Sequence, residues 1–247
     1  MFLKKWNGLP PELQTDEVRV YYDVLKKKRV SLFFKRVFDI VVSLLMLLVL
    51  WPAFVVLAIA IKIDSPGPVF YRQVRVTQYN KRFRIFKFRT MVQNADKGSH
   101  VTVSGDSRIT RVGRVIRKYR LDEISQLIDV LRGTMTFVGT RPEAVKYVEQ
   151  YTPEMMATLL MPAGVTSEAS IYFKDEDKLL DGVEDPDKVY VRDVLPRKMK
   201  YNLKSMKTFS FLRDIKIMFM TVFAVLGKNY FDPSVESEVS ESQESVL

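Results

Sequence analysis

The sequence predicts a mainly α-helical, membrane-associated protein with one small β-hairpin. An uncharged apolar run, Ile40–Ile61, is long enough for about 33 Å of helix, which is comparable with the thickness of a bilayer core. Apolar residues then recur at helical spacing through residues 110–131. Between these two regions, residues 69–89 form two stretches rich in β-branched and aromatic residues around a polar turn, which is typical of a hairpin.

The composition is that of a folded and strongly basic chain. Of its 247 residues, 47% are hydrophobic and 28% are charged, so a packed core is feasible. The formal net charge of +10 indicates anionic partners, which include nucleic acids, anionic lipids and phosphate-bearing substrates. Cysteine is absent from the sequence, and this excludes disulfides, thiolate catalysis and Cys-ligated metals.

Two features of the apolar run favour a re-entrant segment over a simple spanning helix. Pro52 removes a backbone hydrogen bond and divides the run into arms of about 18 Å and about 14 Å, each shorter than the roughly 30 Å of hydrocarbon. Basic residues flank both ends, with Lys35 and Arg36 before the run and Lys62 after it. Because cytoplasmic flanks are enriched in cations, a helix-break-helix that enters and leaves by the cytoplasmic face is expected. A proline kink in an ordinary spanning helix is the alternative.

Two strands are expected at Val69–Val76 and Arg82–Arg89, joined by a turn at Gln78–Lys81. The alternation of the second strand fails at Ile85–Phe86, where a bulge is expected. Basic residues interleaved with aromatics are also typical of nucleic-acid surfaces. Beside a membrane segment, contacts with lipid headgroups or substrate phosphates are the simpler interpretation, so no nucleic-acid partner is predicted.

The most distinctive stretch is residues 110–143, in which a row of cations precedes the adjacent carboxylates Asp122 and Glu123. The apolar periodicity shifts phase near Arg120, which predicts two helical segments that meet there. Asp122 and Glu123 then fall in the first turn of the second segment, where free N–H groups favour a carboxylate or a bound phosphate. Taken alone, the pattern also fits ordinary helix capping beside a solvated basic face.

Two further helical regions are expected towards the carboxyl end. The first covers Val145–Leu160, is interrupted by Pro153, and is rich in Met, which favours core packing over a membrane-facing surface. Residues 162–166 read as a turn. A later helix opens at Leu195, and its apolar part, Ile217–Leu226, is too short to span a bilayer. This part is therefore expected to be packed or to lie amphipathically in the membrane interface.

Several short motifs follow one another along the chain, namely Lys35–Asp39, Asp64–Pro68, Lys87–Met91, Gly105–Arg108, Leu121–Glu123 and Arg141–Glu143. Taken in this order, they resemble the motifs of bacterial sugar transferases, in the small single-domain form of the monotopic phosphoglycosyl transferase superfamily. Each motif alone is weak, but their order around a proline-containing membrane segment is specific. The resemblance extends from Lys35 to about Leu226.

The resemblance implies transfer of a sugar-1-phosphate from a nucleotide sugar, expected to be a UDP-sugar, to a membrane polyprenyl phosphate such as undecaprenyl phosphate. This reaction initiates the assembly of exopolysaccharides and other glycoconjugates. Asp122 would be the nucleophile that forms an aspartyl-phosphosugar intermediate, Glu123 would position or deprotonate the acceptor, and Mg²⁺ would be held partly by Asp122. The alternative is a non-catalytic membrane-associated scaffold of the same fold, against which the intact Asp122, Glu123 and Arg117 count.

The cations near the motifs suit this chemistry, because a carboxylate that attacks a diphosphate must be shielded from repulsion. Lys87, Arg117 and Arg141 are the candidate substrate phosphate-binding residues. The chain also departs from the family pattern. Trp51 precedes Pro52 where a small hydroxyl residue is common, Thr140 replaces the first proline of Pro-Arg-Pro, and no clear counterpart of a later Gly-Arg segment is found.

These observations divide the chain into four parts. Residues 1–34 form a polar N-terminal extension, and residues 35–63 form the re-entrant membrane helix broken at Pro52. Residues 64–231 form a cytoplasmic catalytic domain on the inner membrane, and residues 232–247 form an acidic tail that is expected to be disordered.

Overall fold

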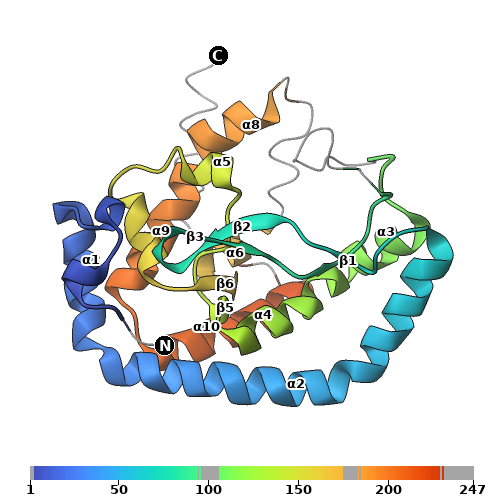
Figure 1. Ribbon diagram of the computed structural model, residues 1–247, viewed down its shortest axis with the longest axis horizontal. Helices are drawn as coiled ribbons and strands as arrows, with labels where there is room; N and C mark the ends of the chain where they lie inside the picture. Colours follow the sequence, from blue (N-terminus) through green and yellow to red (C-terminus); the bar gives the residue numbers. More distant parts are fainter. Residues whose placement is uncertain are drawn as a thin grey trace.

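In the computed structural model, the described residues are 3–93, 95, 106–174, 183, 185–228 and 230. They form a mainly helical protein with three short two-stranded β-pairs, as Figure 1 shows. The helices are α1 Asp16–Lys27, α2 Arg29–Asp64, α3 Arg111–Lys118, α4 Leu127–Arg132, α5 Val145–Val148, α6 Glu168–Tyr172, α8 Pro186–Val189, α9 Leu195–Lys207 and α10 Phe211–Val225. The strands are β1 Phe70–Tyr71, β2 Val74–Thr77, β3 Lys81–Arg84, β4 Lys87–Phe88, β5 Met135–Val138 and β6 Ala163–Thr166. The expected disordered tail lies outside the described residues.

The long helix α2 contains Pro52 without interruption. The predicted break at Pro52 was therefore wrong, because one helix continues from Arg29 to Asp64. Figure 1 shows that α2 runs along the lower edge of the molecule and turns upward in its carboxyl-terminal part. A proline removes one N–H and displaces the preceding turn, so a bend is sufficient to accommodate it within strongly helical neighbours.

Much of the surface of α2 is apolar and uncovered. Within the described residues, α2 is the helix that is long and apolar enough to cross a membrane, and only 6% of its most apolar window is buried in the protein. Large apolar side chains on its outer face are exposed, among them Val41, Leu45, Leu48, Val49 and Trp51. A soluble protein rarely exposes such a continuous apolar face, so the helix is suited to contact with a membrane.

A buried ionic cluster fixes the first part of α2 to the rest of the fold. The Lys35 ammonium lies 2.6 Å from Asp214 Oδ2 of α10 and donates a hydrogen bond of 2.8 Å to the Val138 carbonyl of β5. One turn later, Asp39 accepts hydrogen bonds from the Thr136 hydroxyl at 2.8 Å and from the Phe137 N–H at 3.2 Å. These contacts join α2, β5 and α10 at a single place.

The neighbouring Arg36 caps a second helix. Its guanidinium donates to the Val130 carbonyl at 2.7 Å and to the Leu131 carbonyl at 2.9 Å, both in the last turn of α4. The Val130 carbonyl also accepts a hydrogen bond of 3.0 Å from the Gly133 N–H. Both carbonyls lie at the negative end of the dipole of α4. Gly133, which follows with φ of 82°, provides the left-handed residue that ends α4.

The residues before the apolar run, which the sequence analysis assigned to a polar extension, contribute to the main core. Thr15 caps α1 by accepting from the Val18 N–H. The buried face of α1, which includes Val18, Tyr21 and Leu25, packs against α9 and the 3₁₀ helix η6 (Met155–Leu160).

Pro153 lies between α5 and η6, so the predicted interruption of the helical region Val145–Leu160 is confirmed. Met155 and Met156 pack against core clusters, as expected.

The predicted hairpin forms, although each strand is divided in two. β2 and β3 pair antiparallel with Val74 opposite Arg84, and β1 and β4 pair with Phe70 opposite Phe88. The interruption falls at Ile85 and Phe86, where the alternation of the sequence fails. There the Phe86 N–H takes no part in the strand pairing and instead donates a hydrogen bond of 2.8 Å to Asp129 Oδ2 of α4.

A parallel pair, β5 with β6, was missed, and the prediction of a turn at residues 162–166 was wrong. Met135 lies opposite Ala163 and Val138 opposite Thr166, and every residue of β5 is buried. At the end of β5, a Cβ on Gly164 would lie 2.2 Å from the Gly139 carbonyl oxygen. Only glycine permits this approach, which positions the segment that follows β5.

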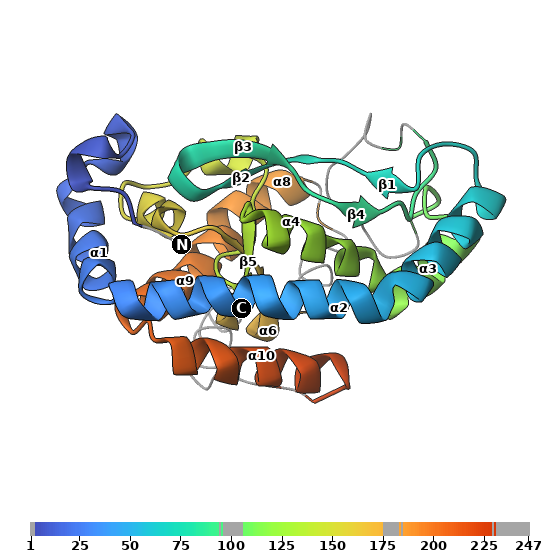
Figure 2. The same ribbon diagram turned by 60° about the horizontal axis from the view of Figure 1, so that its bottom comes forward.

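The expected single helix after Leu195 is two helices, α9 and α10, separated at Thr208–Ser210. Ser210 caps α10 by accepting from the Arg213 N–H. On α10, Asp214 and Ile217 are buried. The opposite face exposes large apolar side chains, namely Leu212, Phe219, Val222, Phe223 and Val225. Figure 2 shows α10 beside α2, so the uncovered apolar surfaces of both helices lie in one region of the molecule.

Candidate active site

The paired carboxylates lie where the chain changes direction after α3. Arg120 adopts a left-handed conformation with φ of 53°, which ends α3 and starts the 3₁₀ helix η5, Leu121–Gln126. Its guanidinium donates to the Lys174 carbonyl at 3.0 Å, and this contact helps hold a conformation that is rare for a non-glycine residue. The predicted junction near Arg120 is confirmed, with Asp122 and Glu123 in the first turn of η5.

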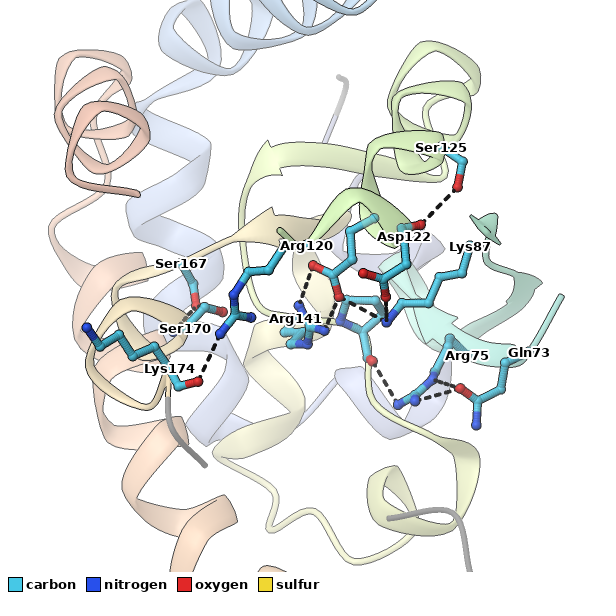
Figure 3. Close-up of polar contacts among 12 residues, drawn as sticks. Gln73, Arg75, Lys87, Arg120, Asp122, Ser125, Arg141, Ser167, Ser170 and Lys174 are labelled. Atoms are coloured by element: carbon cyan, nitrogen blue, oxygen red, sulfur yellow. Dashed lines mark hydrogen bonds and ion pairs between the residues drawn. The ribbon is translucent and has the colours of Figure 1, made fainter. Parts of the chain in front are cut away.

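Two cations from distant parts of the chain meet these carboxylates, as Figure 3 shows. Lys87 of β4 places its ammonium 2.9 Å from Glu123 Oε1 and 3.7 Å from Asp122 Oδ2. Arg141, three residues after β5, forms a bidentate pair with Glu123, with one contact to Oε1 and a second of 3.3 Å to Oε2. The structure thus brings together residues that are far apart in the sequence.

The two adjacent carboxyl groups differ in their electrostatics. Burial raises the pKa of Asp122 above its ordinary value and the charge of Glu123 adds to this effect, while Lys87 and Arg117 oppose it. Burial also opposes ionisation of Glu123, but Arg141 and Lys87 outweigh it and hold the pKa of this carboxyl well below its ordinary value. Glu123 is therefore a stable anion, whereas Asp122 is the more basic of the two carboxylates.

Arg117 lies in the last turn of α3. The charge of Arg117 opposes the rise in the pKa of Asp122 and contributes to the lowered pKa of Asp106, so Arg117 lies near both carboxylates. Asp106 is held chiefly by Arg108, whose guanidinium contacts both carboxylate oxygens at 2.6 to 3.1 Å. The candidate phosphate-binding cations thus approach the carboxylates from β4, α3 and the segment after β5.

The segment that carries Arg141 is fixed on both sides. The Thr140 carbonyl accepts from the Gly164 N–H at 2.8 Å, and the Pro142 carbonyl accepts from Arg75 at 3.2 Å. Both contacts use backbone carbonyls, so they do not depend on the proline that the resemblance led us to expect at Thr140. Figure 3 shows Arg75 beside Gln73, whose side-chain oxygen accepts two hydrogen bonds from its guanidinium.

Glu143 holds the same segment through buried contacts with two other elements. It is buried, accepts a hydrogen bond of 2.7 Å from the Tyr190 hydroxyl, and lies 3.4 Å from the Lys198 ammonium. Sequence reasoning did not assign supporting roles to Arg75, Tyr190 or Lys198. They come from β2, the start of the π-helical turn Tyr190–Val194, and α9, and no local pattern links residues so far apart.

Comparison with known proteins identifies the family of this chain. The family model for bacterial sugar transferases matches residues 30–228, which include every residue of the site described above. The chain belongs to this family.

Among relatives of this family, the UDP-glucose:undecaprenyl-phosphate glucose-1-phosphate transferase of Escherichia coli (strain K12) is 34% identical over 226 residues, which cover 90% of this chain and 44% of that protein. The UDP-N-acetylgalactosamine-undecaprenyl-phosphate N-acetylgalactosaminephosphotransferase of Aeromonas hydrophila is 34% identical over 201 residues, which cover 78% of this chain and 44% of that protein. The chain thus spans less than half the length of these two relatives.

A third relative is similar over its whole length. The exopolysaccharide production protein PSS of Rhizobium leguminosarum bv. phaseoli is 36% identical over 211 residues, which cover 81% of this chain and 100% of that protein. The matched part of the chain is therefore a unit that also occurs without the additional length of the larger family members.

The site fits a magnesium ion that a bound substrate helps to hold. Among the described residues, no group of three His, Cys, Asp or Glu side chains could form a site made by the protein alone. Mg²⁺ in phosphate chemistry needs only one or two carboxylates together with substrate oxygens. Both oxygens of Glu123 are engaged by cations, whereas one oxygen of Asp122 faces Lys87 at 3.7 Å, so Asp122 is the residue that would hold the ion.

Replacement of Arg141 by Lys tests the bidentate contact. Lysine keeps the charge but has no planar fork, so the contact with Glu123, and a matching contact with a phosphate, would each lose one hydrogen bond. We expect Arg141→Lys to lower kcat/KM for sugar-phosphate transfer by about 10²-fold. Arg192→Lys, at an exposed pair with Asp193, is the matched control and should leave the rate unchanged. Equal rates for both variants would show that Arg141 is a surface cation without a role in binding phosphate.

Glu143 should contribute stability that depends on pH. Burial opposes its ionisation, yet Lys198, Arg75 and Tyr190 hold its pKa below the ordinary 4.5. A depressed folded-state pKa means that this stability is present above about pH 4.5 and is lost as the pH falls toward the folded-state value. We expect Glu143→Gln to lower the stability at neutral pH by about 1–3 kcal/mol.

The measurement is Tm in detergent between neutral pH and about pH 4, compared with Glu149→Gln at an exposed position. The difference in Tm between wild type and Glu143→Gln should shrink as the pH falls. A constant difference would show that the Glu143 charge does not contribute to stability.

Proposed function

We propose that this chain transfers a sugar-1-phosphate from a UDP-sugar to undecaprenyl phosphate, or to a similar polyprenyl phosphate, at the start of glycan assembly. The observation that carries the proposal is the pair of adjacent carboxylates with opposite pKa shifts, Asp122 and Glu123, within reach of Lys87, Arg117 and Arg141. The names of the relatives describe transfers of this type. A scaffold of the same fold would have no need for a buried nucleophile beside phosphate-binding cations.

The reaction proceeds in two displacements at one phosphorus atom. An Asp122 carboxylate oxygen attacks the phosphorus that bears the sugar, and the bond from this phosphorus to the bridging oxygen breaks. The nucleoside monophosphate leaves with that oxygen, and an aspartyl-phosphosugar forms. A phosphate oxygen of the polyprenyl phosphate then attacks the same phosphorus, which restores the Asp122 carboxylate and gives a polyprenyl diphosphate sugar.

The electrostatics of the site suit this division of roles. A carboxylate with a raised pKa is the better nucleophile once ionised, and Lys87 and Arg117 offset its repulsion by the diphosphate. Mg²⁺, held by Asp122 and the substrate phosphates, would neutralise further charge. Glu123 is a weak base while Arg141 and Lys87 hold its pKa down. A phosphate that draws these cations away would make Glu123 more basic, and it could then position or deprotonate the acceptor.

The apolar surfaces of α2 and α10 support a place for the chain on the inner membrane, with the site on the cytoplasmic face. We propose that α2 enters the cytoplasmic leaflet, bends near Pro52 and returns to the same side. The bend, the exposed apolar side chains of α2 and the exposed face of α10 all favour such an arrangement. Apart from the one hydrogen bond that Pro52 removes, a continuous helix satisfies its backbone groups internally, as a bilayer requires.

Release of nucleoside monophosphate from UDP-sugars by the detergent-solubilised protein tests the reaction. With Mg²⁺ and undecaprenyl phosphate, we expect multiple turnovers with one UDP-sugar of a panel. Without the acceptor, release should stop at about one equivalent of enzyme, because the covalent intermediate has no displacing nucleophile. A scaffold would release nothing under either condition, and this outcome would overturn the proposal.

The absence of cysteine allows a direct test of the topology. Single cysteines at Lys28 and Lys62, which are exposed near the two ends of α2, should both react with a membrane-impermeant thiol reagent only after the cytoplasmic face is opened. Pro52→Ala should straighten the helix and move part of the population towards a spanning orientation, with a loss of activity. Labelling of one site from outside intact wild-type cells would show that α2 spans the bilayer.

A further inference from the structure

A pocket of about 360 Å³ connects the candidate active site with the uncovered apolar faces of α2 and α10. Its volume falls in the range of sites that enclose small organic ligands. Apolar side chains from α2, α4, β5 and α10 form most of its wall. They include Met46, Leu127, Phe137, Met218, Val222 and Val225.

The two ends of this pocket differ in character. At the end next to the active site, four cations line it together with one carboxylate, Glu123. These cations are Lys118, Arg120, Arg141 and Lys174. At the other end, Val222 and Val225 are each 55% exposed, on the surface of α10 that we assign to the membrane. An occupant that matches both ends has an anionic head and a long apolar tail.

The pocket also separates the two carboxylates of the site. Glu123 and Arg141 form part of its lining, whereas Asp122 and Lys87 do not. A group that enters through the pocket therefore meets Glu123 first and approaches Asp122 from one side. The nucleotide sugar is polar along its whole length and gains little from an apolar wall, so it is a poor match for this space.

We propose that this pocket binds the polyprenyl phosphate acceptor, with its phosphate among Lys118, Arg120 and Lys174 and its first isoprene units along the apolar wall. The rest of the chain leaves between α2 and α10 into the lipid. This inference rests on the proposed function and assigns a place to its second substrate. Arg120 has a double role, because its contact with the Lys174 carbonyl also joins the η5 turn to α6 at the cationic end.

Filling the apolar part of the pocket tests the assignment. Ala224→Trp places a large ring in the lining, far in sequence from the carboxylates. Phe219→Trp is the matched control, since Phe219 lies on the same helix, is 63% exposed and is not part of the lining. We expect Ala224→Trp to raise the KM for undecaprenyl phosphate at least tenfold, while adduct formation from UDP-sugar alone continues at the wild-type rate. The control should match wild type in both measurements.

The two half-reactions separate the possible failures. A wild-type acceptor KM in Ala224→Trp, with adduct formation intact, would overturn the pocket assignment and leave the proposed function standing. If wild-type protein formed no adduct and no product, the proposed function itself would fail.

A measurement on the wild-type protein does not depend on the variant folding. Undecaprenyl phosphate with a photoreactive diazirine on an isoprene unit near the phosphate should cross-link to peptides from α6 and α10 that line the pocket. Unlabelled undecaprenyl phosphate should compete with this labelling, and phosphatidylglycerol vesicles should not. Labelling confined to the outer faces of α2 and α10, or displaced equally by phosphatidylglycerol, would show a general lipid contact and contradict the proposal.

Discussion

Asp122→Asn should reduce turnover by at least about 10³-fold, because the amide keeps the size of the side chain but removes the attacking charge. The same change should raise Tm when it is measured with a chelator and without substrate. Burial and Glu123 raise the pKa of Asp122, which means that its ionised form is less favourable in the folded protein than in the unfolded chain. Loss of activity with gain of stability would separate a catalytic effect from unfolding.

Glu123→Gln is the matched control for Asp122→Asn. The pKa of Glu123 is held well below its ordinary value, so the charge of Glu123 stabilises the folded state at neutral pH. This variant should lower Tm and impair transfer to the acceptor, while an adduct from UDP-sugar still forms. A fall in Tm in Asp122→Asn as large as that in Glu123→Gln would contradict the electrostatic assignment.

Lys35→Met should destabilise the protein by about 3–5 kcal/mol, because it leaves the Asp214 carboxylate buried without its cation. Lys35 is 2% exposed and contacts Asp214 at 2.6 Å, and burial already raises the pKa of Asp214 despite this contact. The variant should also loosen α2 from α10. Chemical denaturation in detergent measures the change in free energy of unfolding.

Two further variants identify the origin of that change. Lys62→Met removes an exposed cation from the other end of α2 and should alter stability by no more than about 0.5 kcal/mol. Lys35→Met combined with Asp214→Asn should recover part of the loss, since neither charge of the pair is then left alone. If the double variant were as unstable as the sum of the single variants, the ion pair would not be the cause.

The local part of the site could be predicted from the sequence. The phase shift near Arg120 and the two carboxylates after it are local signals, and the structure confirms both the junction and the first-turn position. The hairpin alternates strongly enough to be recognised, and its failure at Ile85–Phe86 marked the place where the strands are interrupted. Each of these features depends on neighbours within a few residues.

The remaining features depend on contacts between distant residues, which a sequence pattern does not encode. The β5–β6 pair joins segments nearly thirty residues apart, and the Ala-Gly-Val-Thr sequence of β6 resembles a turn because its glycine serves a close backbone approach. Lys35 was interpreted as a cytoplasmic flanking charge, whereas it is a buried partner of Asp214. Pro52 predicted a broken helix, but strong helical neighbours on both sides allow the chain to bend instead.

The covalent step at Asp122 is most directly tested by the intact mass of the wild-type protein after incubation with Mg²⁺ and its UDP-sugar, without acceptor. We predict an increase equal to one phosphosugar, located by peptide mapping on the segment that contains Asp122, and its disappearance when undecaprenyl phosphate is added. Asp122 would not be the nucleophile if the adduct lay on another residue, if it persisted in Asp122→Asn, or if product formed in a single turnover without any adduct.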